Sequence, residues 1–266
     1  MNTIKISKFN KKLVVKFNDR KIELPKKWQD KVNDYWQSLI ESGKKYTRGD
    51  VFTVVKNEEL VYEHQILVEK TDYAHYLYCQ NVDAEMEGYG VKVIFTSCLV
   101  ETSDNKIIFG KMGEHTARAG IYQLCGGGVD SSDIKDGIFD FLGNISKELK
   151  EEFDIDVKDE SRVNEIDATY LKQGGETKKM AVVFKVKLNE VSEDFLRKYN
   201  LFAQYLKNEN RSPEFGEIVV LERTKNNIED FFNQNRSECD EYMEPLFKFA
   251  YSDYILPEYK HIPSYS

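Results

Sequence analysis

The sequence predicts an α+β fold from three observations. Apolar residues alternate in several short segments, they recur every three or four positions in others, and no internal repeat or low-complexity segment interrupts the chain. The chain has 266 residues, 41% of them hydrophobic, which suffices for one large core or two smaller ones. We expect an N-terminal α+β module over residues 1–85, a larger domain over residues 86–250 and a C-terminal tail over residues 251–266.

In the N-terminal module, residues 4–24 alternate polar and apolar side chains, which predicts a β-hairpin. A helix follows over residues 25–43, with an apolar stripe that includes Trp28 and Val32. Three segments within residues 51–80, "VFTVV", "LVYEHQILV" and "YAHYLYC", predict short strands. The stretch "NVDAEMEGYG" has no period and two glycines near its end, so we place the domain boundary there.

The larger domain begins with two predicted strands, at residues 91–101 and 106–112, joined by a turn. "IYQLCGGGVD" predicts a short strand that runs into three glycines, and the acidic loop "SSDIKDG" follows it. The next helix has an apolar stripe of Ile138, Phe141 or Leu142, Ile145, Leu149 and Phe153. Two further strands, "MAVVFKVKL" and "EIVVL", enclose the helical segment "VSEDFLRKYNLFAQYLKNEN", and residues 228–250 predict one or two terminal helices.

The charge of the chain limits its partners. A net charge of -8 and a pI near 5.3 disfavour nucleic acid and anionic membranes, because both require a surplus of Lys and Arg on one face. A small phosphorylated ligand is compatible with this charge if carboxylates hold a metal ion beside it. We therefore expect a small-molecule partner, bound by a monomer or a homodimer.

The cysteines and the N-terminus indicate a location. Four widely spaced cysteines, with no C-x-x-C pair and no zinc-ligand spacing, predict free thiols in a reducing compartment. The N-terminal residues lack an apolar signal core, and no run of 18 apolar residues occurs. We expect a cytoplasmic protein.

The segment "SKELKEEFDI" places Glu148, Glu151 and Glu152 at i, i+3 and i+4, on the side of a helix opposite its apolar stripe. Carboxylates at these spacings repel one another by a few tenths of a kcal/mol per pair, and a divalent cation would reverse that effect. On a helix alone, such a cluster is most often a solvated face. The preceding glycine turn favours a metal site, because backbone without side chains can approach a phosphate or an ion.

These residues resemble the signature of the Nudix hydrolases, G-x5-E-x7-R-E-U-x-E-E-x-G-U, in which U is aliphatic. Residues 147–155, "KELKEEFDI", match its second half, and "LCGGGVD" resembles the glycine pair that opens it. The resemblance implies the Nudix α/β/α sandwich over the larger domain.

The chain departs from this signature at several positions. Lys147 replaces the arginine, which keeps the charge but loses the fork geometry. Asp154 replaces the glycine, which is tolerable because Asp also adopts left-handed conformations. Phe139 stands where the first glutamate is expected, and the stretch before Lys147 is longer than usual by several residues. Asp140 or Asp136 could substitute for that glutamate.

The resemblance implies a metal site. By the motif, Glu148, Glu151 and Glu152 bind Mg²⁺, or Mn²⁺ in its place, and take part in catalysis. The backbone near Gly127 and Gly128 contacts the metal or the substrate. Oxygen ligands without His or Cys favour such hard cations.

Two further roles are expected from the same resemblance. A carboxylate must position the attacking water, and the candidates are Glu148 and a later residue of "RSPEFGEIVVLE". Of the later residues we favour Glu214 over Glu217, since Glu217 opens a strand. Lys111 and Arg118 precede the glycine turn and are expected to reach the diphosphate of the substrate.

The rest of the chain suggests a substrate. A tryptophan-bearing N-terminal helix, the long acidic loop and "PEFGEIVVL" resemble the UDP-sugar pyrophosphatase branch. This resemblance implies cleavage of a nucleotide sugar, such as UDP-glucose, to a nucleoside monophosphate and a sugar phosphate. Two alternatives stay open: an ADP-ribose or NADH-type pyrophosphatase, and a non-catalytic nucleotide-sensing module, although such modules usually lose motif glutamates.

Overall fold

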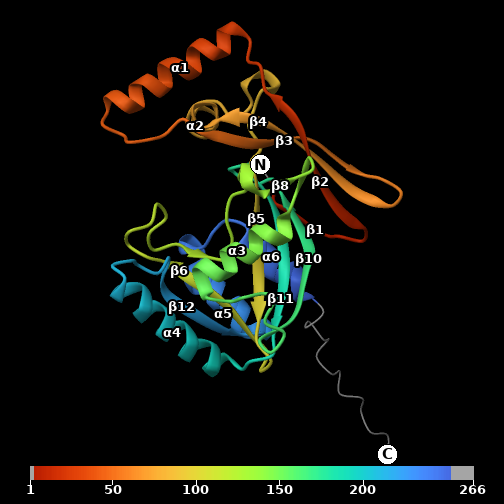
Figure 1. Ribbon diagram of the computed structural model, residues 1–266, viewed down its shortest axis with the longest axis vertical. Coiled ribbons are helices and arrows are strands. Elements are labelled where there is room, and N and C mark those ends of the chain that lie inside the picture. The colour runs from red at the N-terminus through yellow and green to blue at the C-terminus, as the bar shows by residue number, and fades with distance from the viewer. Residues whose placement is uncertain (1–2, 253–266) are drawn as a thin grey trace, which may run out of the picture. The chain divides into compact units, whose positions relative to one another are not determined.

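The computed structural model describes residues 3–252 and confirms the predicted α+β class, with two β-sheets and six α-helices among these residues (Figure 1). Contacts divide the chain into two compact units, which are described separately. The first comprises Met1–Leu99 and Cys125–Val186, and the second comprises Val100–Leu124 and Lys187–Ser266. Strand β5 (Ile94–Glu101) runs from the first unit into the second.

One sheet of the first unit has the order β3-β4-β2-β9-β8, made of β2 (Lys12–Lys21), β3 (Asp50–Glu59), β4 (Glu63–Asp72), β8 (Ile134–Lys135) and β9 (Ile138–Phe139). Strands β3 and β4 are antiparallel, whereas β2 pairs with β4 in parallel. The hairpin predicted over residues 4–24 is therefore wrong. Residues 4–24 contain two strands, β1 (Lys5–Lys8) and β2, which belong to different sheets, and the parallel partner of β2 lies some fifty residues later in the chain.

Helix α1 (Lys26–Glu41) is confirmed where it was predicted. Helix α2 (Tyr73–Asn81) replaces the predicted strand "YAHYLYC", and that prediction is wrong. The side chain of Asp72 caps α2 by accepting a hydrogen bond of 3.0 Å from the backbone N–H of His75. A cap and a helical spacing of buried residues thus outweigh the β-propensity of the aromatic side chains.

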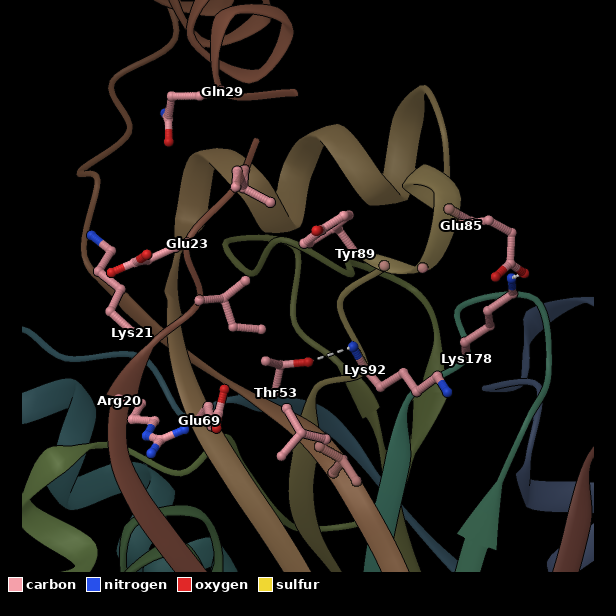
Figure 2. A pocket seen from close by; sticks show the side chains of 17 residues that line it. Arg20, Lys21, Glu23, Gln29, Thr53, Glu69, Glu85, Tyr89, Lys92 and Lys178 are labelled. Carbon is pink, nitrogen blue, oxygen red and sulfur yellow. Dashed lines mark hydrogen bonds and ion pairs between the residues drawn. The ribbon is translucent and has the colours of Figure 1, made fainter. Parts of the chain in front are cut away.

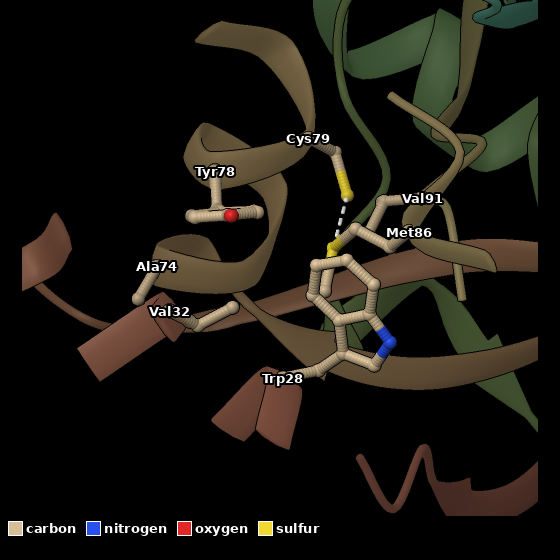
Figure 3. Close-up of a cluster of buried hydrophobic side chains, with 7 residues drawn as sticks. All are labelled: Trp28, Val32, Ala74, Tyr78, Cys79, Met86 and Val91. Atoms are coloured by element: carbon tan, nitrogen blue, oxygen red, sulfur yellow. Dashed lines mark hydrogen bonds between the residues drawn. The ribbon is translucent and has the colours of Figure 1, made fainter. Parts of the chain in front are cut away.

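Helices α1 and α2 share a hydrophobic cluster (Figure 3). It consists of Trp28 and Val32 from α1, Ala74, Tyr78 and Cys79 from α2, and Met86 and Val91 from the following loop. The thiol of Cys79 lies 3.3 Å from the sulfur of Met86. The apolar stripe predicted for the first helix is therefore core packing.

The second sheet contributes the order β1-β10-β11-β5 to the first unit, with β1 (Lys5–Lys8), β10 (Val163–Gln173) and β11 (Met180–Leu188). Strand β10 was not predicted. Strand β1 pairs with β10, so a strand of the expected N-terminal module belongs to a sheet of the expected larger domain. The contact units thus differ from a division at residue 85, and a separate N-terminal module stays a prediction.

The second unit contains the end of β5, β6 (Lys106–Met112), β7 (Tyr122–Gln123) and β12 (Phe215–Glu222). Its helices are α4 (Ser192–Asn208), α5 (Lys225–Asn235) and α6 (Met243–Ala250). Phe109 of β6 contacts Phe231 of α5 and Phe247 of α6, with ring centroids 5.1 and 5.7 Å apart. The aromatic faces of both terminal helices therefore pack on β6.

Three smaller predictions can be compared with the described residues. Cys79, Cys98, Cys125 and Cys239 are free thiols, as predicted. No helix within residues 3–252 is both long and apolar enough to span a bilayer. The expected tail begins at Tyr251, which is buried and donates a hydrogen bond of 3.0 Å to Glu101, while residues 253–266 lie outside the described part of the chain. The cytoplasmic location stays a prediction.

Candidate functional site

The motif glutamates lie on α3 (Phe141–Phe153) in the first unit. Asp140 caps this helix and accepts a hydrogen bond of 2.8 Å from the N–H of Gly143. Ile138, predicted on the apolar stripe of the helix, instead lies in β9. The helix ends at Asp154 in the left-handed conformation, with φ of 54°, so the aspartate adopts the backbone that the glycine of the signature would provide.

The three glutamates differ in their surroundings. Glu152 is only 2% exposed, Glu148 is half-buried and Glu151 is exposed. A carboxylate is rarely buried without polar partners, and Glu152 accepts a hydrogen bond of 3.2 Å from the N–H of Gly126. Glu152 is therefore not part of a solvated face.

The helix packs closely on the glycine turn at residues 126–128. A Cβ atom at Gly127 would overlap the carboxylate of Glu148, so a residue with a side chain could not stand there without moving that glutamate. Glu148 and Glu152 are four residues apart and share one helix face. On this face, the Glu148 side chain lies against Gly127, and the Glu152 side chain accepts the hydrogen bond from Gly126.

The backbone carbonyl groups around the glycine turn differ in their hydrogen bonding. Those of Cys125 and Gly127 each accept a hydrogen bond of 2.9 Å from a backbone N–H of β5. Between them stands the carbonyl of Gly126, a residue with φ of 149°. It has no hydrogen-bond partner within residues 3–252. We had expected the backbone near Gly127 and Gly128 to serve a metal or substrate, but the carbonyl that is left over belongs to Gly126.

Asp133 stands at the spacing that the Nudix signature gives to its first carboxylate. Counting the signature spacing G-x5-E forward from Gly127 leads to Asp133, which is buried at 8% exposure. The substitutes expected from the sequence have other tasks. Asp140 is the cap of α3, and Asp136 has φ of 51° in the turn between β8 and β9.

The extra length of the motif is the β8–β9 hairpin. Thirteen residues separate Asp133 from Lys147, and six of them, residues 134–139, form the hairpin, which leaves the seven of the signature. The N–H of Asp140 donates to the carbonyl of Asp133 at 2.7 Å and closes the hairpin at its base. The dipeptide Asp-Gly at its turn, with Ile134 two residues before it and Ile138 directly after it, was the sequence signal that predicts such a hairpin.

A fourth residue of the same helix face, Asn144, was not predicted. Its side-chain amide donates hydrogen bonds of 3.0 Å both to the carbonyl of Gly128 and to the carboxylate of Asp133. Asn144 precedes Glu148 by one helical turn, so the face continues along all three glycines. The available signal was its spacing, since Asn144, Glu148 and Glu152 recur every four residues and therefore share one helix face.

A buried thiol adjoins Glu152. Burial above all, and then contacts with the Cys98 thiol and the Glu152 carboxylate, raise the pKa of the Cys125 thiol well above its usual range. The thiol therefore stays protonated at neutral pH and can donate a weak hydrogen bond to the carboxylate. On the same helix, the Lys147 ammonium lies 3.9 Å from the carboxylate of Asp130 in the preceding loop.

The oxygen atoms of this face suit a hard divalent cation in kind, since they belong to carboxylates and to the Gly126 carbonyl, which has no hydrogen-bond partner within residues 3–252. Among residues 3–252, however, no three His, Cys, Asp or Glu side chains are gathered closely enough to hold a metal ion. Like charges at i, i+3 and i+4 repel, which favours separated carboxylates in the absence of a cation.

The remaining predicted site residues lie in the second unit. Lys111 forms an ion pair of 2.7 Å with Glu238, and Arg118 pairs with Asp240. Glu214 is exposed just before β12, as is Glu217 within the strand, and the carbonyl of Glu214 accepts a hydrogen bond of 2.8 Å from the N–H of Gly113. The roles assigned to Lys111, Arg118 and Glu214 stay predictions.

A cavity of about 1190 Å³ lies elsewhere in the first unit, beside the sheet that contains β3 and β4 (Figure 2). Residues labelled along it include Arg20, Lys21, Glu69, Tyr89, Lys92 and Lys178. None of the motif residues lines this cavity. The candidate site is therefore defined by the contact between helix and glycine turn.

Comparison with known proteins gives no family model and no curated protein that matches the chain. Solved structures do show similarity. A MutT protein from Methanosarcina mazei Go1 is 15% identical, with a TM-score of 0.37, over 60% of this chain and 92% of its own. The E. coli ORF135 protein is 14% identical, with a TM-score of 0.34, over 62% and 94%. The NUDIX domain of Shewanella oneidensis NrtR, solved with ADP ribose, is 10% identical, with a TM-score of 0.27, over 50% and 97%.

Proposed function

We propose that the chain is a Nudix-type hydrolase that cleaves the diphosphate of a nucleoside diphosphate derivative. The observation that supports this most is the contact of one face of α3 with the glycine turn, through Glu148 at Gly127 and Glu152 at Gly126. The carboxylate at Asp133, at the signature spacing from Gly127, adds to the resemblance.

The proposed metal ligands are Glu148, Glu151 and Glu152, joined by the carbonyl of Gly126. Bound Mg²⁺ or Mn²⁺ would neutralise charge on the phosphoryl oxygens and lower the pKa of the attacking water. The residues of the chain would supply orientation: the N–H of Gly126 holds the Glu152 carboxylate, and the missing side chain at Gly127 leaves room for the Glu148 carboxylate.

A general base would take the proton of the attacking water. Glu148 is the first candidate because it is half-buried beside the glycine turn. Glu214 of the second unit is the second candidate, and it rests on the motif resemblance alone.

For the substrate we propose a nucleotide sugar such as UDP-glucose, released as nucleoside monophosphate and sugar phosphate. This choice rests on the resemblance of the N-terminal helix, the long acidic loop and "PEFGEIVVL" to the UDP-sugar pyrophosphatase branch. ADP-ribose and NADH are the alternative substrates, because the metal ligands would act on the same diphosphate linkage.

A substrate panel tests the proposal. The full chain is incubated with Mg²⁺ and, separately, UDP-glucose, UDP-galactose, ADP-ribose or NADH, and the products are resolved by ion-exchange chromatography. We expect a nucleoside monophosphate from the nucleotide sugars and none in excess EDTA. Full turnover in EDTA would refute metal dependence. Binding of these ligands without turnover would identify a sensing module instead.

A further inference from the structure

The side-chain amide of Asn144 is fully hydrogen-bonded. Asn144 has no exposed surface. Its two amide hydrogens reach the carbonyl of Gly128 and the carboxylate of Asp133, each at 3.0 Å. Its oxygen accepts a hydrogen bond from the hydroxyl of Thr96. One side chain therefore connects α3 to three segments: strand β5, the glycine turn and the loop before the hairpin.

Asn144 matters to the glycine turn because the turn has few other restraints. Glycines contribute no side chains to packing and leave the backbone conformationally free. Glu152 holds the N–H of Gly126, β5 holds the carbonyl of Gly127, and Asn144 holds the carbonyl of Gly128. Without Asn144, the last carbonyl of the turn would have no donor among residues 3–252.

We infer that Asn144 is a positioning residue for the proposed hydrolysis. By fixing Gly128, it keeps the turn against the helix face, so that the N–H of Gly126 stays on the Glu152 carboxylate. The inference rests on the proposed function for its kinetic consequence. Its structural consequence, an ordered glycine turn, can be measured without any turnover.

The chemistry of the contact decides which substitutions test it. Asn144→Asp keeps the shape and the acceptor for Thr96 but removes both donors and sets a second carboxylate against Asp133. Adding Asp133→Asn in the same chain removes that repulsion and restores a donor–acceptor pair between positions 133 and 144. In this double variant the carbonyl of Gly128 still lacks its donor.

We expect Asn144→Asp to lower the melting temperature and the double variant to recover much of that loss. The kcat of the double variant should nevertheless stay about tenfold or more below wild type, with KM within about twofold, because altering groups that orient metal ligands costs about 10- to 100-fold. Deuterium uptake in the peptide 121–130 should be faster than in wild type, while uptake in residues 145–153 stays unchanged.

Ser146→Ala is the matched control on the same helix. The Ser146 hydroxyl bonds only to the carbonyl of Leu142 within the described chain, at 2.5 Å, so kcat and exchange in the turn should match wild type. If the double variant recovers kcat together with its melting temperature, or exchanges in the turn like wild type, Asn144 is merely structural and the inference is wrong. If wild type hydrolyses none of the substrates but the turn still opens in the double variant, the proposed function fails and the positioning of the turn stands.

Discussion

At the scale of single residues, the three motif glutamates are not equivalent. Glu152 is buried and held by the N–H of Gly126, Glu148 adjoins Gly127, and Glu151 is exposed. A helix surface made for solvation would expose all three alike. Substitution of Glu152 therefore tests the site most directly.

Glu152→Gln should abolish turnover while the chain still folds. The glutamine oxygen can accept the hydrogen bond from Gly126, so the buried position stays satisfied, but a metal-ligand charge is lost. We expect kcat to fall by about 100-fold or more, since even residues that support metal ligands account for about 10- to 100-fold. Steady-state kinetics with Mg²⁺ measure this change.

Thermal melts with and without Mg²⁺ provide the second measurement on this variant. A ligand that binds only the native state raises the melting temperature, so wild type should gain more from Mg²⁺ than Glu152→Gln. Glu193→Gln, an exposed glutamate at the start of α4, serves as the control and should respond like wild type. An equal response in all three proteins would mean that Glu152 binds no metal.

The thiols of Cys79 and Cys239 should react slowly near neutral pH and faster as the pH rises. Burial raises the pKa of Cys79 to about 11 and that of Cys239 to about 11. Since only the thiolate reacts, about one thiol in a thousand is reactive at pH 8, and this fraction grows about tenfold per pH unit until the pKa is reached. Alkylation with iodoacetamide, followed by mass spectrometry, should label the native chain slowly and all four thiols in denaturant. Rapid native labelling at pH 8 would contradict this.

At the residue level, the roles of the motif glutamates stay predictions, and the position of the carboxylate before them depends on the direction of counting. Counting backward from Lys147 gives Phe139, whereas counting forward from Gly127 gives Asp133. The two counts disagree because a hairpin intervenes, and that hairpin is stabilised by pairing with β2, more than a hundred residues earlier. Glycine spacing alone carries no information about such a distant partner.

At the scale of elements, the β8–β9 hairpin connects the motif to the sheet that contains β2. Ile138 pairs with Lys16 of β2. Phe139 is buried, and its ring lies edge-on to Phe52 at 5.0 Å and to Phe17 at 6.2 Å. The start of the motif helix is thereby anchored in an aromatic cluster.

Phe139→Ala should lower the free energy of unfolding by about 3 to 5 kcal/mol, the usual cost of removing a buried phenylalanine ring. Leu142→Ala, three residues later at a position that is 49% exposed, should change it by less than about 0.5 kcal/mol. Urea denaturation followed by circular dichroism measures both. Similar values for the two variants would show that the aromatic cluster contributes little to the anchoring of the hairpin.

Elements whose apolar residues recur with a clear period were predicted well. Elements that depend on strand pairing or on a cap outside the segment were not. The strands β6 and β11 and the helix α1 have the bounds, or nearly the bounds, that periodicity gave. Strand β10 was missed because its polar and apolar residues do not separate cleanly, and it is stabilised by pairing on both sides with β1 and β11. Helix α2 was misread because its aromatic residues have high β-propensity while its cap lies outside the segment.

At the scale of the whole molecule, strand pairing within the first unit crosses the domain boundary expected near residue 85. Strand β1 pairs with β10, and β9 pairs with β2. Each segment thus supplies a strand to the sheet of the other. An N-terminal module that folds alone would have to form without the pairing of β1 with β10 and of β2 with β9.

Deleting residues 1–85 should destabilise the remainder. The edge of β10 would lose four paired residues, and Phe139 would lose Phe17 and Phe52. A loss of about 3 kcal/mol corresponds to a fall in melting temperature of about 6 to 12 °C for a chain of this size. Thermal circular dichroism of residues 86–266 against the full chain measures this. An unchanged melting temperature would instead support the separate module.

Natural selection can alter the β8–β9 hairpin without moving either of its ends, because the backbone of Asp140 is hydrogen-bonded to that of Asp133 at its base. The number of residues that can be added to or removed from the hairpin is restricted. Adding or removing one residue would turn the position of Phe139 from the core to solvent, whereas adding or removing two would preserve it. We expect homologous chains to differ here by even numbers of residues. The distance in space between Asp133 and Asp140 is fixed by their backbone hydrogen bond, whereas the number of residues between them can vary.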